Sequence, residues 1–566
     1  MGVARSPLPT SSTTRIDVTM NVANISYLPA DEAIGILDLT AGELLRQASF
    51  DEPTRTALIE VTPPGGVGMV DGVPAGPRTW TYAELLAEAE QAAQWLLTKF
   101  EPGEHICVWA PNIAEWVVLQ YGAALGGLVL VTANPALRSA ELEYVLDQSK
   151  SVGIVYVDAF RGTAMTAIVD DVLPRVPRVR EAIRFAAWDT DVRGFTGPTR
   201  ALPTVSPTDP AQVQYTSGTT GFPKGALLHH RGLITNAAYV HRRAEFPRFG
   251  VWATALPLFH TAGCGMSVLG TATSRGTLVL IHLFEPTFVL KALQDWKADL
   301  FGGVPAMYAG LLADPDLDTY DLTSVKVTAS GGDAVPPAMI RDVEQHFGSR
   351  FTTVYGQTEL SPIVAQTSPY DSEDDRHTTT GRPLWQVELK IANPGDGSIV
   401  KRGEQGEICA RGYQVMLGYF DMPDETGQTI DVDGWLHTGD LGVLDPRGYL
   451  CVTGRLKDMI ICGGENIYPR EIEAALQAHP GVAGVAVFGI ADEQWGESVA
   501  AVVVPADPAE PPSQEDLHRF AREHLAPHKT PKRWYLTSAL PANSMGKIQK
   551  FLLKDQVSSG SLDDLT

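Results

Sequence analysis

The sequence predicts an α/β fold with a large N-terminal body of helix-covered sheets, a small β subdomain and a smaller, mobile mixed α/β domain at the C-terminus. Three observations support this prediction. The chain has 566 residues, which is more than one ordinary domain holds. Strand-like and helix-like segments alternate from about residue 104 onward. The character of the sequence then changes near residue 385 and again near residue 454.

The alternation in the first part of the chain assigns individual elements. A βαβ rhythm of this kind favours a largely parallel sheet with helices on its faces. Pro336 and Pro337 stand where the start of a helix tolerates proline. We expect strands at 105–110, 128–133, 152–157, 251–256 and 325–329, and helices at 114–125, 139–148, 286–297 and 336–347.

The last third of the chain has shorter elements. Segments 387–391 and 407–410 are separated by Gly and Pro turns, which indicates a β-rich subdomain. After Gly454 the pattern is mixed again, and Pro469 opens a helix. We therefore expect three regions, which are a disordered tail (1–24), an N-terminal domain (25–454) and a C-terminal domain (455–566).

Composition and charge exclude several classes of protein. With 44% hydrophobic and 20% charged residues the chain is typical of a globular protein, and it has no apolar stretch long enough for a membrane helix. A net charge of −23 argues against a nucleic-acid partner. The five cysteines are scattered without a CxxC pair, which excludes a disulfide framework or a cysteine zinc site. We expect a cytoplasmic protein, or one in an organelle matrix if the N-terminal segment is a transit peptide.

The strongest single motif is the segment from Tyr215 to Gly225, which reads YTSGTTGFPKG. Its glycines free the backbone to point N–H groups inward, and its hydroxyls add donors, so that it predicts an anion cradle. It is not a Walker A loop, because Pro223 and Gly225 flank Lys224. The residues that we expect to bind phosphate are Thr216, Ser217, Gly218, Thr219, Thr220, Gly221 and Lys224.

Four further motifs follow in a fixed order. They are Tyr355–Glu359 (YGQTE), Thr438–Asp440 (TGD), Gly454–Asp458 (GRLKD) and Pro541–Lys547 (PANSMGK). With the glycine-rich loop, they make the chain resemble the acyl-adenylate-forming superfamily, which includes acyl-CoA synthetases, firefly luciferase and the adenylation domains of peptide synthetases. The resemblance extends from about residue 40 to residue 553. It implies an ATP-dependent acyl-CoA synthetase with ATP, Mg²⁺ and coenzyme A as cofactors or co-substrates.

This reaction brings two anions together, because a carboxylate attacks the α-phosphate of ATP. Positive charge must offset their repulsion, and Lys547 is the best candidate for supplying it. The resemblance implies that Glu359 holds Mg²⁺, a cation that prefers oxygen ligands, and that Thr358 binds phosphate.

The nucleoside has its own set of expected partners. Tyr355 would stack on adenine beside the turn that contains Gly332 and Asp333. Asp440 can accept both ribose hydroxyls, and Arg455 can donate to the same sugar.

Two features concern the second step, in which a thiol takes the acyl group. Lys457 occupies the hinge position of the superfamily, where the small domain rotates after adenylation. The loop that begins with Gly463 and Gly464 would then line the path of the pantetheine arm.

The acid is constrained by residues expected around the acyl tunnel. Acetate-activating relatives carry Trp at the position of Gly356, so we expect an open space there. His260 is expected to be a tunnel wall rather than a base, since a carboxylate needs no deprotonation at neutral pH. Gly302, Gly303 and Val304 are expected to line the same tunnel. These residues predict a medium-chain or longer acid, or alternatively an aromatic one. The C-terminal motifs most resemble those of medium-chain fatty acyl-CoA ligases.

Three alternatives remain at this stage. The acceptor could be the phosphopantetheine thiol of a carrier protein. Comparing the acylation of free coenzyme A with that of a phosphopantetheinyl protein would distinguish the two. A luciferase-like oxygenase shares the motifs, although no residue points to oxygen chemistry. A non-catalytic nucleotide-binding protein would have lost residues such as Lys547, Glu359 and Asp440, which are present. The sequence does not fix the oligomeric state, and a homodimer is compatible with it.

Overall fold

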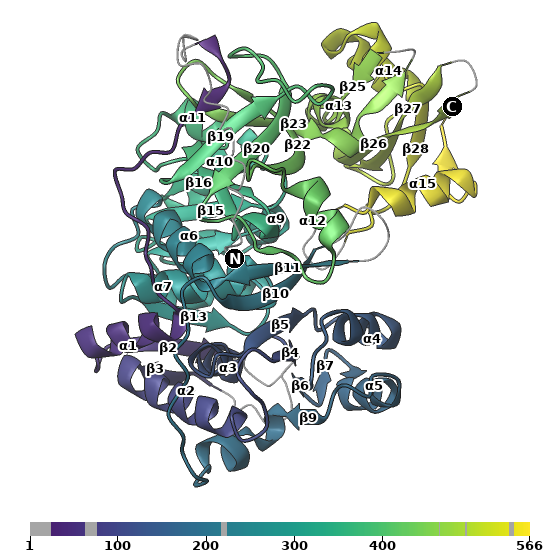
Figure 1. Cartoon of the computed structure of the whole chain (residues 1–566). Coiled ribbons are helices and arrows are strands. Elements are labelled where there is room, and N and C mark those ends of the chain that lie inside the picture. Colours follow the sequence, from purple (N-terminus) through teal and green to yellow (C-terminus); the bar gives the residue numbers. More distant parts are fainter. Residues whose placement is uncertain are drawn as a thin grey trace, which may run out of the picture.

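The protein is described by a computed structural model over residues 24–62, 76–216, 223–462, 465–492, 495–542 and 548–565. Figure 1 shows a large N-terminal body and a smaller C-terminal domain set against one side of it. The predicted α/β fold class is confirmed, and two large sheets form the centre of the body.

The first large sheet has nine strands, most of them parallel. Its edges are antiparallel, where β3 pairs with β2 and where β17 and β18 follow β16. The strands in spatial order are β18 (Arg382–Pro383), β17 (Ile363–Gln366), β16 (Arg350–Gly356), β15 (Val327–Gly331), β14 (Leu300–Gly303), β12 (Val251–Thr254), β13 (Thr277–Ile281), β2 (Thr56–Val61) and β3 (Arg78–Thr81).

The second large sheet has seven strands and is parallel from β10 to β9. An antiparallel hairpin joins β10 to β11, and the phosphate loop of the sequence connects these two strands. In spatial order the strands are β21 (Gly418–Tyr419), β11 (Lys224–His229), β10 (Pro210–Thr216), β5 (Val129–Ala133), β4 (His105–Trp109), β6 (Gly153–Tyr156) and β9 (Glu181–Arg184).

Helices fill the space between the two sheets and cover their outer faces. One core cluster joins side chains of both sheets to helices α1, α2, α3 and α6, whereas a second cluster joins the other face of the nine-stranded sheet to α8, α9 and α10. The helices are α1 (Ala41–Asp51), α2 (Tyr82–Leu96), α3 (Ala114–Leu125), α4 (Ser139–Gln148), α5 (Met165–Val172), α6 (His230–Arg243), α7 (Gly270–Thr273), α8 (Pro286–Asp295), α9 (Pro305–Leu312), α10 (Pro337–Phe347), α11 (Glu373–Thr378) and α12 (Pro423–Thr429), and a π-helix, η6 (Ala262–Leu269), precedes α7.

The β subdomain predicted near residue 385 is an antiparallel sheet of five strands. In spatial order they are β1 (Tyr27–Leu28), β19 (Val387–Ala392), β20 (Gly406–Gly412), β22 (Leu436–Leu444) and β23 (Leu450–Arg455). The last strand leads directly toward the C-terminal domain, so that this small sheet lies between the body and that domain (Figure 1).

The C-terminal domain has its own sheet and its own core. The strands β26 and β27 form its long central hairpin. Its elements are β24 (Ile460–Cys462), β25 (Glu465–Ile467), α13 (Pro469–Gln477), β26 (Val482–Asp492), β27 (Gly496–Pro505), α14 (Gln514–His524), β28 (Arg533–Leu536), α15 (Lys550–Ser558) and β29 (Asp563–Asp564).

The expected elements agree with the structure, with small shifts at their ends. The strand expected at 325–329 is β15 at Val327–Gly331, and the helix expected at 336–347 starts one residue later, after Pro336 as its N-cap. The helix expected to begin at Pro469 is α13. Periodicity thus located the elements, while their ends depend on hydrogen bonds that it does not report.

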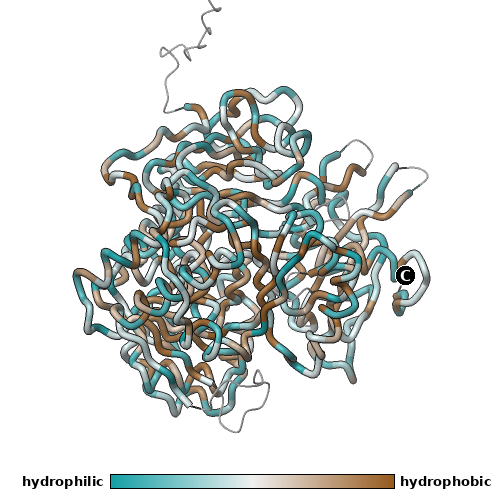
Figure 2. Tube along the Cα trace, turned by 60° about the horizontal axis from the view of Figure 1, so that its bottom comes forward, coloured by the Kyte–Doolittle hydropathy of each residue, from teal (hydrophilic) through white to brown (hydrophobic). Residues whose placement is uncertain are grey.

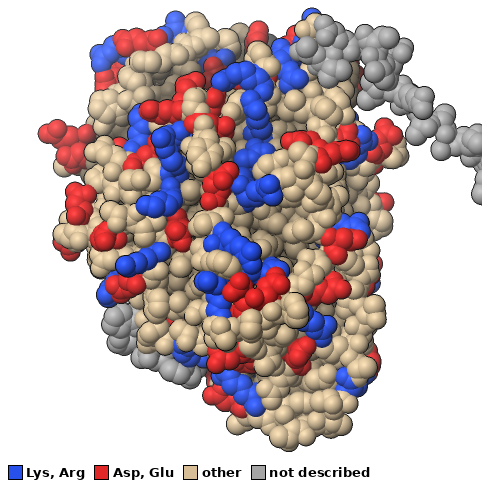
Figure 3. Space-filling model, turned by 90° about the vertical axis from the view of Figure 1, so that its left-hand side faces the viewer, with Lys and Arg blue, Asp and Glu red and all other residues tan. Residues whose placement is uncertain are grey.

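Hydropathy and charge are distributed as in a globular protein. Hydrophobic segments run mainly through the interior of both domains, and many outer loops are hydrophilic (Figure 2). On the face shown in Figure 3, positive and negative side chains are intermingled. Within the described ranges, no helix combines the length and the apolar character needed to cross a bilayer.

A buried histidine packs in the middle of the body, where α6 meets η6. The His241 ring stacks on Trp252 with centroids 4.5 Å apart, and its Nε2–H donates to the Met266 carbonyl at 2.9 Å. Burial lowers the pKa of His241 to about 3, so the native state holds the ring neutral at physiological pH. Burial likewise lowers the pKa of His230 to about 4.

These neutral histidines predict a loss of stability on acidification. The unfolded chain takes up their protons below a pKa of about 6.5, whereas folded His241 resists protonation down to a pKa of about 3. Stability therefore falls as the pH drops through this window, by about 1.4 kcal/mol per pH unit for each such group. His241→Gln should reduce that dependence by about this amount, measured by urea unfolding at pH 7 and pH 5.5. The control is His528→Gln at an exposed position. If the free energy of unfolding of His241→Gln depends on pH as that of the unaltered protein does, the prediction is wrong.

Candidate active site

A cavity of about 820 Å³ opens where the large body, the β subdomain and the start of the C-terminal domain meet. The carboxyl ends of β14, β15 and β16 form one wall of it, with Gly303, Gly331 and Gly356 at its surface. Carboxyl ends of parallel strands are where ligands bind in open α/β sheets. Residues of β22 and β23 form the opposite wall.

A buried carboxylate, that of Asp440, lies at the centre of the β22 side. Asp440 on β22 is the direct cross-strand partner of Arg455 on β23, and the Arg455 Nε lies 3.0 Å from Asp440 Oδ1. The Tyr355 hydroxyl, from β16 of the nine-stranded sheet, donates to Asp440 Oδ2 at 3.0 Å. Burial and the charge of Asp440 raise the pKa of Tyr355 well above its usual value, so the hydroxyl remains a donor. The structure thus brings together three residues that the sequence assigns to the nucleoside.

The turn after β15 lies on the same cavity. Gly332 has φ +81°, a conformation that favours glycine, and Asp333 follows it at the surface of the cavity. Lys457 also lines the cavity, and burial together with the charge of Arg455 lowers its pKa below the usual lysine value.

The carboxylate of Glu359 is buried in the wall of the cavity, in a short 3₁₀ turn that follows β16. Its Oε1 accepts a hydrogen bond of 2.7 Å from the Tyr419 hydroxyl, and Thr358 lies beside it at the cavity surface. A carboxylate and a hydroxyl are oxygen donors, and Mg²⁺ in nucleotide sites takes one or two carboxylates and completes its shell with phosphate and water. The residues present therefore fit a magnesium ion.

Two of the residues predicted to bind phosphate lie at the end of one hairpin. Thr216 and Lys224 are cross-strand partners at the open end of β10 and β11, and both line the cavity. The Lys224 ammonium lies 5.0 Å from the centre of the Tyr419 ring. The other predicted phosphate residues lie outside the described residues, namely Ser217, Gly218, Thr219, Thr220 and Gly221, as do Gly463, Gly464 and Lys547.

The far end of the cavity is apolar. Burial lowers the pKa of His260 to about 4, so its ring is neutral at physiological pH and is suited to a wall. Gly302, Gly303 and Val304 line this end as expected. The larger side chains around it are Trp252, Leu256, Phe259, Met266 and Ile363.

Gly356 also lines the cavity, but the expectation of an open space at its side-chain position is wrong. A Cβ added to Gly356 would lie 1.9 Å from the carbonyl oxygen of Pro362 and 2.8 Å from the Cα of Ile363. The chain after β16 turns back here, and the pairing of β16 with β17 shifts register at this point. The glycine is therefore required by a close backbone approach, and the opening of the cavity depends on other residues.

Sequence reasoning missed the aromatic partner of Glu359 and a polar cluster beside Asp440. Tyr419 has no motif that would mark it. In the polar cluster, Glu407 and Cys409 are two residues apart on β20, and His437 faces them from β22. The period of two along a strand could have suggested that Glu407 and Cys409 share a face. Hydrogen bonds from His437 to Cys409 and Glu407 raise the pKa of the histidine to about 10.

Comparisons with known proteins agree with this geometry. The AMP-binding enzyme family model matches residues 46–420, and the model for the AMP-binding enzyme C-terminal domain matches residues 471–547. The chain therefore belongs to the AMP-binding enzyme family. It is an acid–thiol ligase of the acyl-CoA synthetase kind, a class that uses ATP, a carboxylic acid and coenzyme A and forms AMP.

Individual relatives cover nearly the whole chain. YngI of Bacillus subtilis, whose name assigns it to the acyl-CoA synthetases, is 36% identical over 549 residues, which are 92% of this chain and 97% of the relative. The mitochondrial medium-chain acyl-CoA ligase ACSF2 of Rattus norvegicus is 30% identical over 572 residues, 95% of this chain and 90% of the relative. The crystal structure of ATP-bound MatB from Rhodopseudomonas palustris superposes with a TM-score of 0.81 at 28% identity, covering 92% of this chain and 99% of that one.

The close approach at Gly356 gives a testable prediction. Gly356→Ala places a methyl group against the Pro362 carbonyl, so β16 and β17 must separate at the cavity wall. We expect unfolding in urea to become easier by about 2 kcal/mol, the usual cost of overpacking. Gly427→Ala is the matched control, because it lies in α12 with no atom within 4 Å of an added Cβ. Equal stability of the two variants would contradict the steric argument.

Proposed function

We propose that this chain activates a medium-chain or longer fatty acid, or alternatively an aromatic acid, as an acyl-adenylate and then transfers the acyl group to coenzyme A. One observation carries the proposal. A single cavity joins a polar end, with Asp440, Glu359 and Lys224, to an apolar end around Trp252 and Met266. A nucleotide in the first and an acyl chain in the second would meet at their reactive groups.

In the first step a carboxylate oxygen of the acid bonds to the α-phosphorus of ATP, and the bond from that phosphorus to pyrophosphate breaks. Lys224 and the hydroxyls of Thr216 and Thr358 would bind phosphate oxygens, while Tyr355, Arg455 and Asp440 would hold the nucleoside beside Gly332 and Asp333. Glu359 would hold Mg²⁺, which offsets phosphate charge when bound. Lys547 would contact the carboxylate and phosphate oxygens and stabilise the charge that develops between them.

In the second step the thiolate of coenzyme A attacks the acyl carbonyl carbon, and AMP leaves with the bonding electron pair. This step needs a path for the pantetheine arm, which we assign to the loop at Gly463 and Gly464. Alternation between the steps would use a hinge at Lys457, between an N-terminal domain (25–454) and a C-terminal domain (455–566).

The arrangement of the C-terminal domain supports this alternation. The start of α13 packs toward the cavity, since Tyr468 lies 4.0 Å from the Cβ position of Gly454 and the charges of Asp333 and Asp440 act on half-buried Arg470. By contrast, Ala542 and Ile548, the described residues nearest in sequence to Lys547, do not line the cavity. On this proposal, the thiol-transfer face would be the one turned to the cavity here, and the domain would rotate for adenylation.

The carrier-protein alternative is not favoured, because the relatives are named as ligases or synthetases of acyl-CoA. The rat relative is named for medium-chain acids, and this name agrees with the apolar end of the cavity.

The role of Lys547 is tested by separating the two steps. Lys547→Ala should slow acid-dependent exchange of pyrophosphate into ATP by about a hundredfold or more, because a preorganised charge is lost from the transition state. Thioester formation from supplied acyl-adenylate should continue at the rate of the unaltered protein.

The matched control is Lys554→Ala, which removes an exposed lysine of α15. Exchange at the unaltered rate in Lys547→Ala would show that this lysine has another role. Equal loss of both steps would instead indicate that the variant damages the whole site.

The acid is tested with a series of straight-chain acids from butanoate to hexadecanoate, followed by coenzyme A-dependent release of AMP. Each methylene that enters the apolar end adds about 0.8 kcal/mol of transfer free energy, so kcat/KM should rise about fourfold per methylene until that end is full. Val304→Phe narrows the apolar end and should move the optimum toward shorter acids. A flat profile, or an optimum at butanoate, would contradict the proposed substrate class.

A further inference from the structure

We propose that Glu407, Cys409 and His437 form a binding site for a thiophilic divalent cation such as Zn²⁺, next to the nucleotide cavity and separate from the expected magnesium site at Glu359. Cysteines scattered along the sequence without a CxxC pair argue against a zinc site made of cysteines alone. The fold nevertheless places Cys409, with its near neighbour Glu407, beside a histidine 28 residues further along the chain, and the three donor atoms all lie within 4.8 Å of one another.

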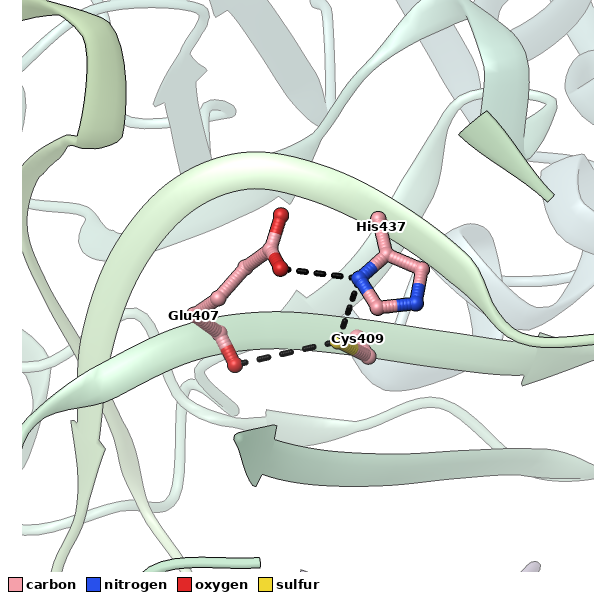
Figure 4. Close-up of side chains that lie close together, drawn as sticks. All are labelled: Glu407, Cys409 and His437. Atoms are coloured by element: carbon pink, nitrogen blue, oxygen red, sulfur yellow. Dashed lines mark hydrogen bonds and ion pairs between the residues drawn. The ribbon is translucent and has the colours of Figure 1, made fainter. Parts of the chain in front are cut away.

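The strand register explains how the three side chains meet. Glu407 and Cys409 are two residues apart on β20 and therefore point to the same face. His437 on β22 is the direct cross-strand partner of Cys409. Figure 4 shows the Glu407 carboxylate and the Cys409 sulfur both directed at the same nitrogen of the His437 ring.

The distances are close to those of a tetrahedral site. The Cys409 Sγ lies 3.5 Å from His437 Nδ1, and Glu407 Oε2 lies 2.8 Å from the same nitrogen. Donor atoms around tetrahedral zinc are separated by about 3.3 to 3.8 Å, which follows from metal–ligand distances of about 2.0 to 2.3 Å. The distance between the Cys409 sulfur and the His437 nitrogen already lies in this range. A small rotation of the Glu407 side chain would lengthen the distance between its carboxylate oxygen and that nitrogen into the same range.

Partners outside the donor set support the same interpretation. The other ring nitrogen of His437, Nε2, faces Asp431 Oδ2 at 3.5 Å, which is the carboxylate–histidine arrangement common behind metal ligands. The second carboxylate oxygen of Glu407, Oε1, accepts the Gly439 N–H at 3.1 Å. Both ligands are thereby oriented by neighbours that would not compete for the ion.

Burial and access also fit a metal ion. Glu407 is 8% exposed and Cys409 is fully buried, while the His437 side chain is 30% exposed, so the cluster lies at the edge of the protein interior. Glu407 and His437 nevertheless line the large cavity, which gives an ion an entry path and leaves room for water at a fourth position. A thiolate and an imidazole select zinc-like ions over Mg²⁺ and Ca²⁺, which prefer oxygen.

The test uses Co²⁺ as a spectroscopic probe, on the full chain treated with a chelator and kept reduced under nitrogen. We expect one equivalent of Co²⁺ to bind with thiolate-to-cobalt charge-transfer absorption and the strong visible bands of a tetrahedral ion, and Zn²⁺ to remove both. Cys409→Ser should abolish the charge-transfer absorption. Glu407→Gln keeps the thiol and its absorption but should bind at least about tenfold more weakly.

Cys451→Ser is the matched control, because this thiol lies on β23 of the same sheet and outside the cluster. It should titrate as the unaltered protein does. Weak octahedral spectra without charge transfer would overturn the proposal, as would absorption that survives in Cys409→Ser or disappears in Cys451→Ser. Circular dichroism of each variant verifies that it is folded. If Cys409→Ser does not fold, Glu407→Gln still tests the site independently.

Discussion

The ion pair and hydrogen bond at Asp440 determine how the parts of this protein are joined. A buried carboxylate is costly unless it is paired and hydrogen-bonded, and Asp440 has both kinds of partner. One partner, Arg455, belongs to the β subdomain, and the other, Tyr355, belongs to the nine-stranded sheet. The Tyr355 hydrogen bond therefore ties the β subdomain to the carboxyl end of β16, beside the apolar cluster that joins the two sheets. The cavity is the space that this junction leaves.

The same junction is compatible with the ribose contact that we propose for Asp440. Its Oδ2 accepts one hydrogen bond and its Oδ1 lies in an ion pair, whereas a carboxylate offers about four acceptor positions in all. Two ribose hydroxyls could therefore bind without displacing Arg455 or Tyr355. A chain with a net charge of −23 could bind a polyphosphate in this way, since binding would depend on the nearby cations of Lys224, Arg455 and Lys457, which line the cavity, rather than on the total charge.

Much of the fold and part of the site could be predicted from the sequence, for physical reasons that differ between residues. The strands around the cavity are apolar runs of the right length, and motif residues that follow β15 and β16, such as Asp333 and Glu359, come together because parallel strands end at one edge. Asp440 lies instead within β22 of the antiparallel sheet on the other side of the cavity. The effect of Gly356 could not be predicted, because the obstacle is the backbone of Pro362 after a reversal of the chain. Tyr419 was missed for a related reason, since its contact with Glu359 spans 60 residues and depends on the pairing of β21 with β11.

The cluster on β20 and β22 is coupled to the nucleotide side through a single side chain. Glu407 holds the His437 ring with one oxygen and the Gly439 backbone with the other, and Gly439 directly precedes Asp440. Any change in what Glu407 binds would therefore alter the support of the turn that carries Asp440, the carboxylate that we propose binds the ribose. Because such coupling is reciprocal, a nucleotide that fixes Asp440 must also change the affinity of the cluster for its own ligand. Because the Glu407–Gly439 hydrogen bond connects this cluster to the turn at Asp440, ion binding at the cluster would affect nucleotide binding by the enzyme.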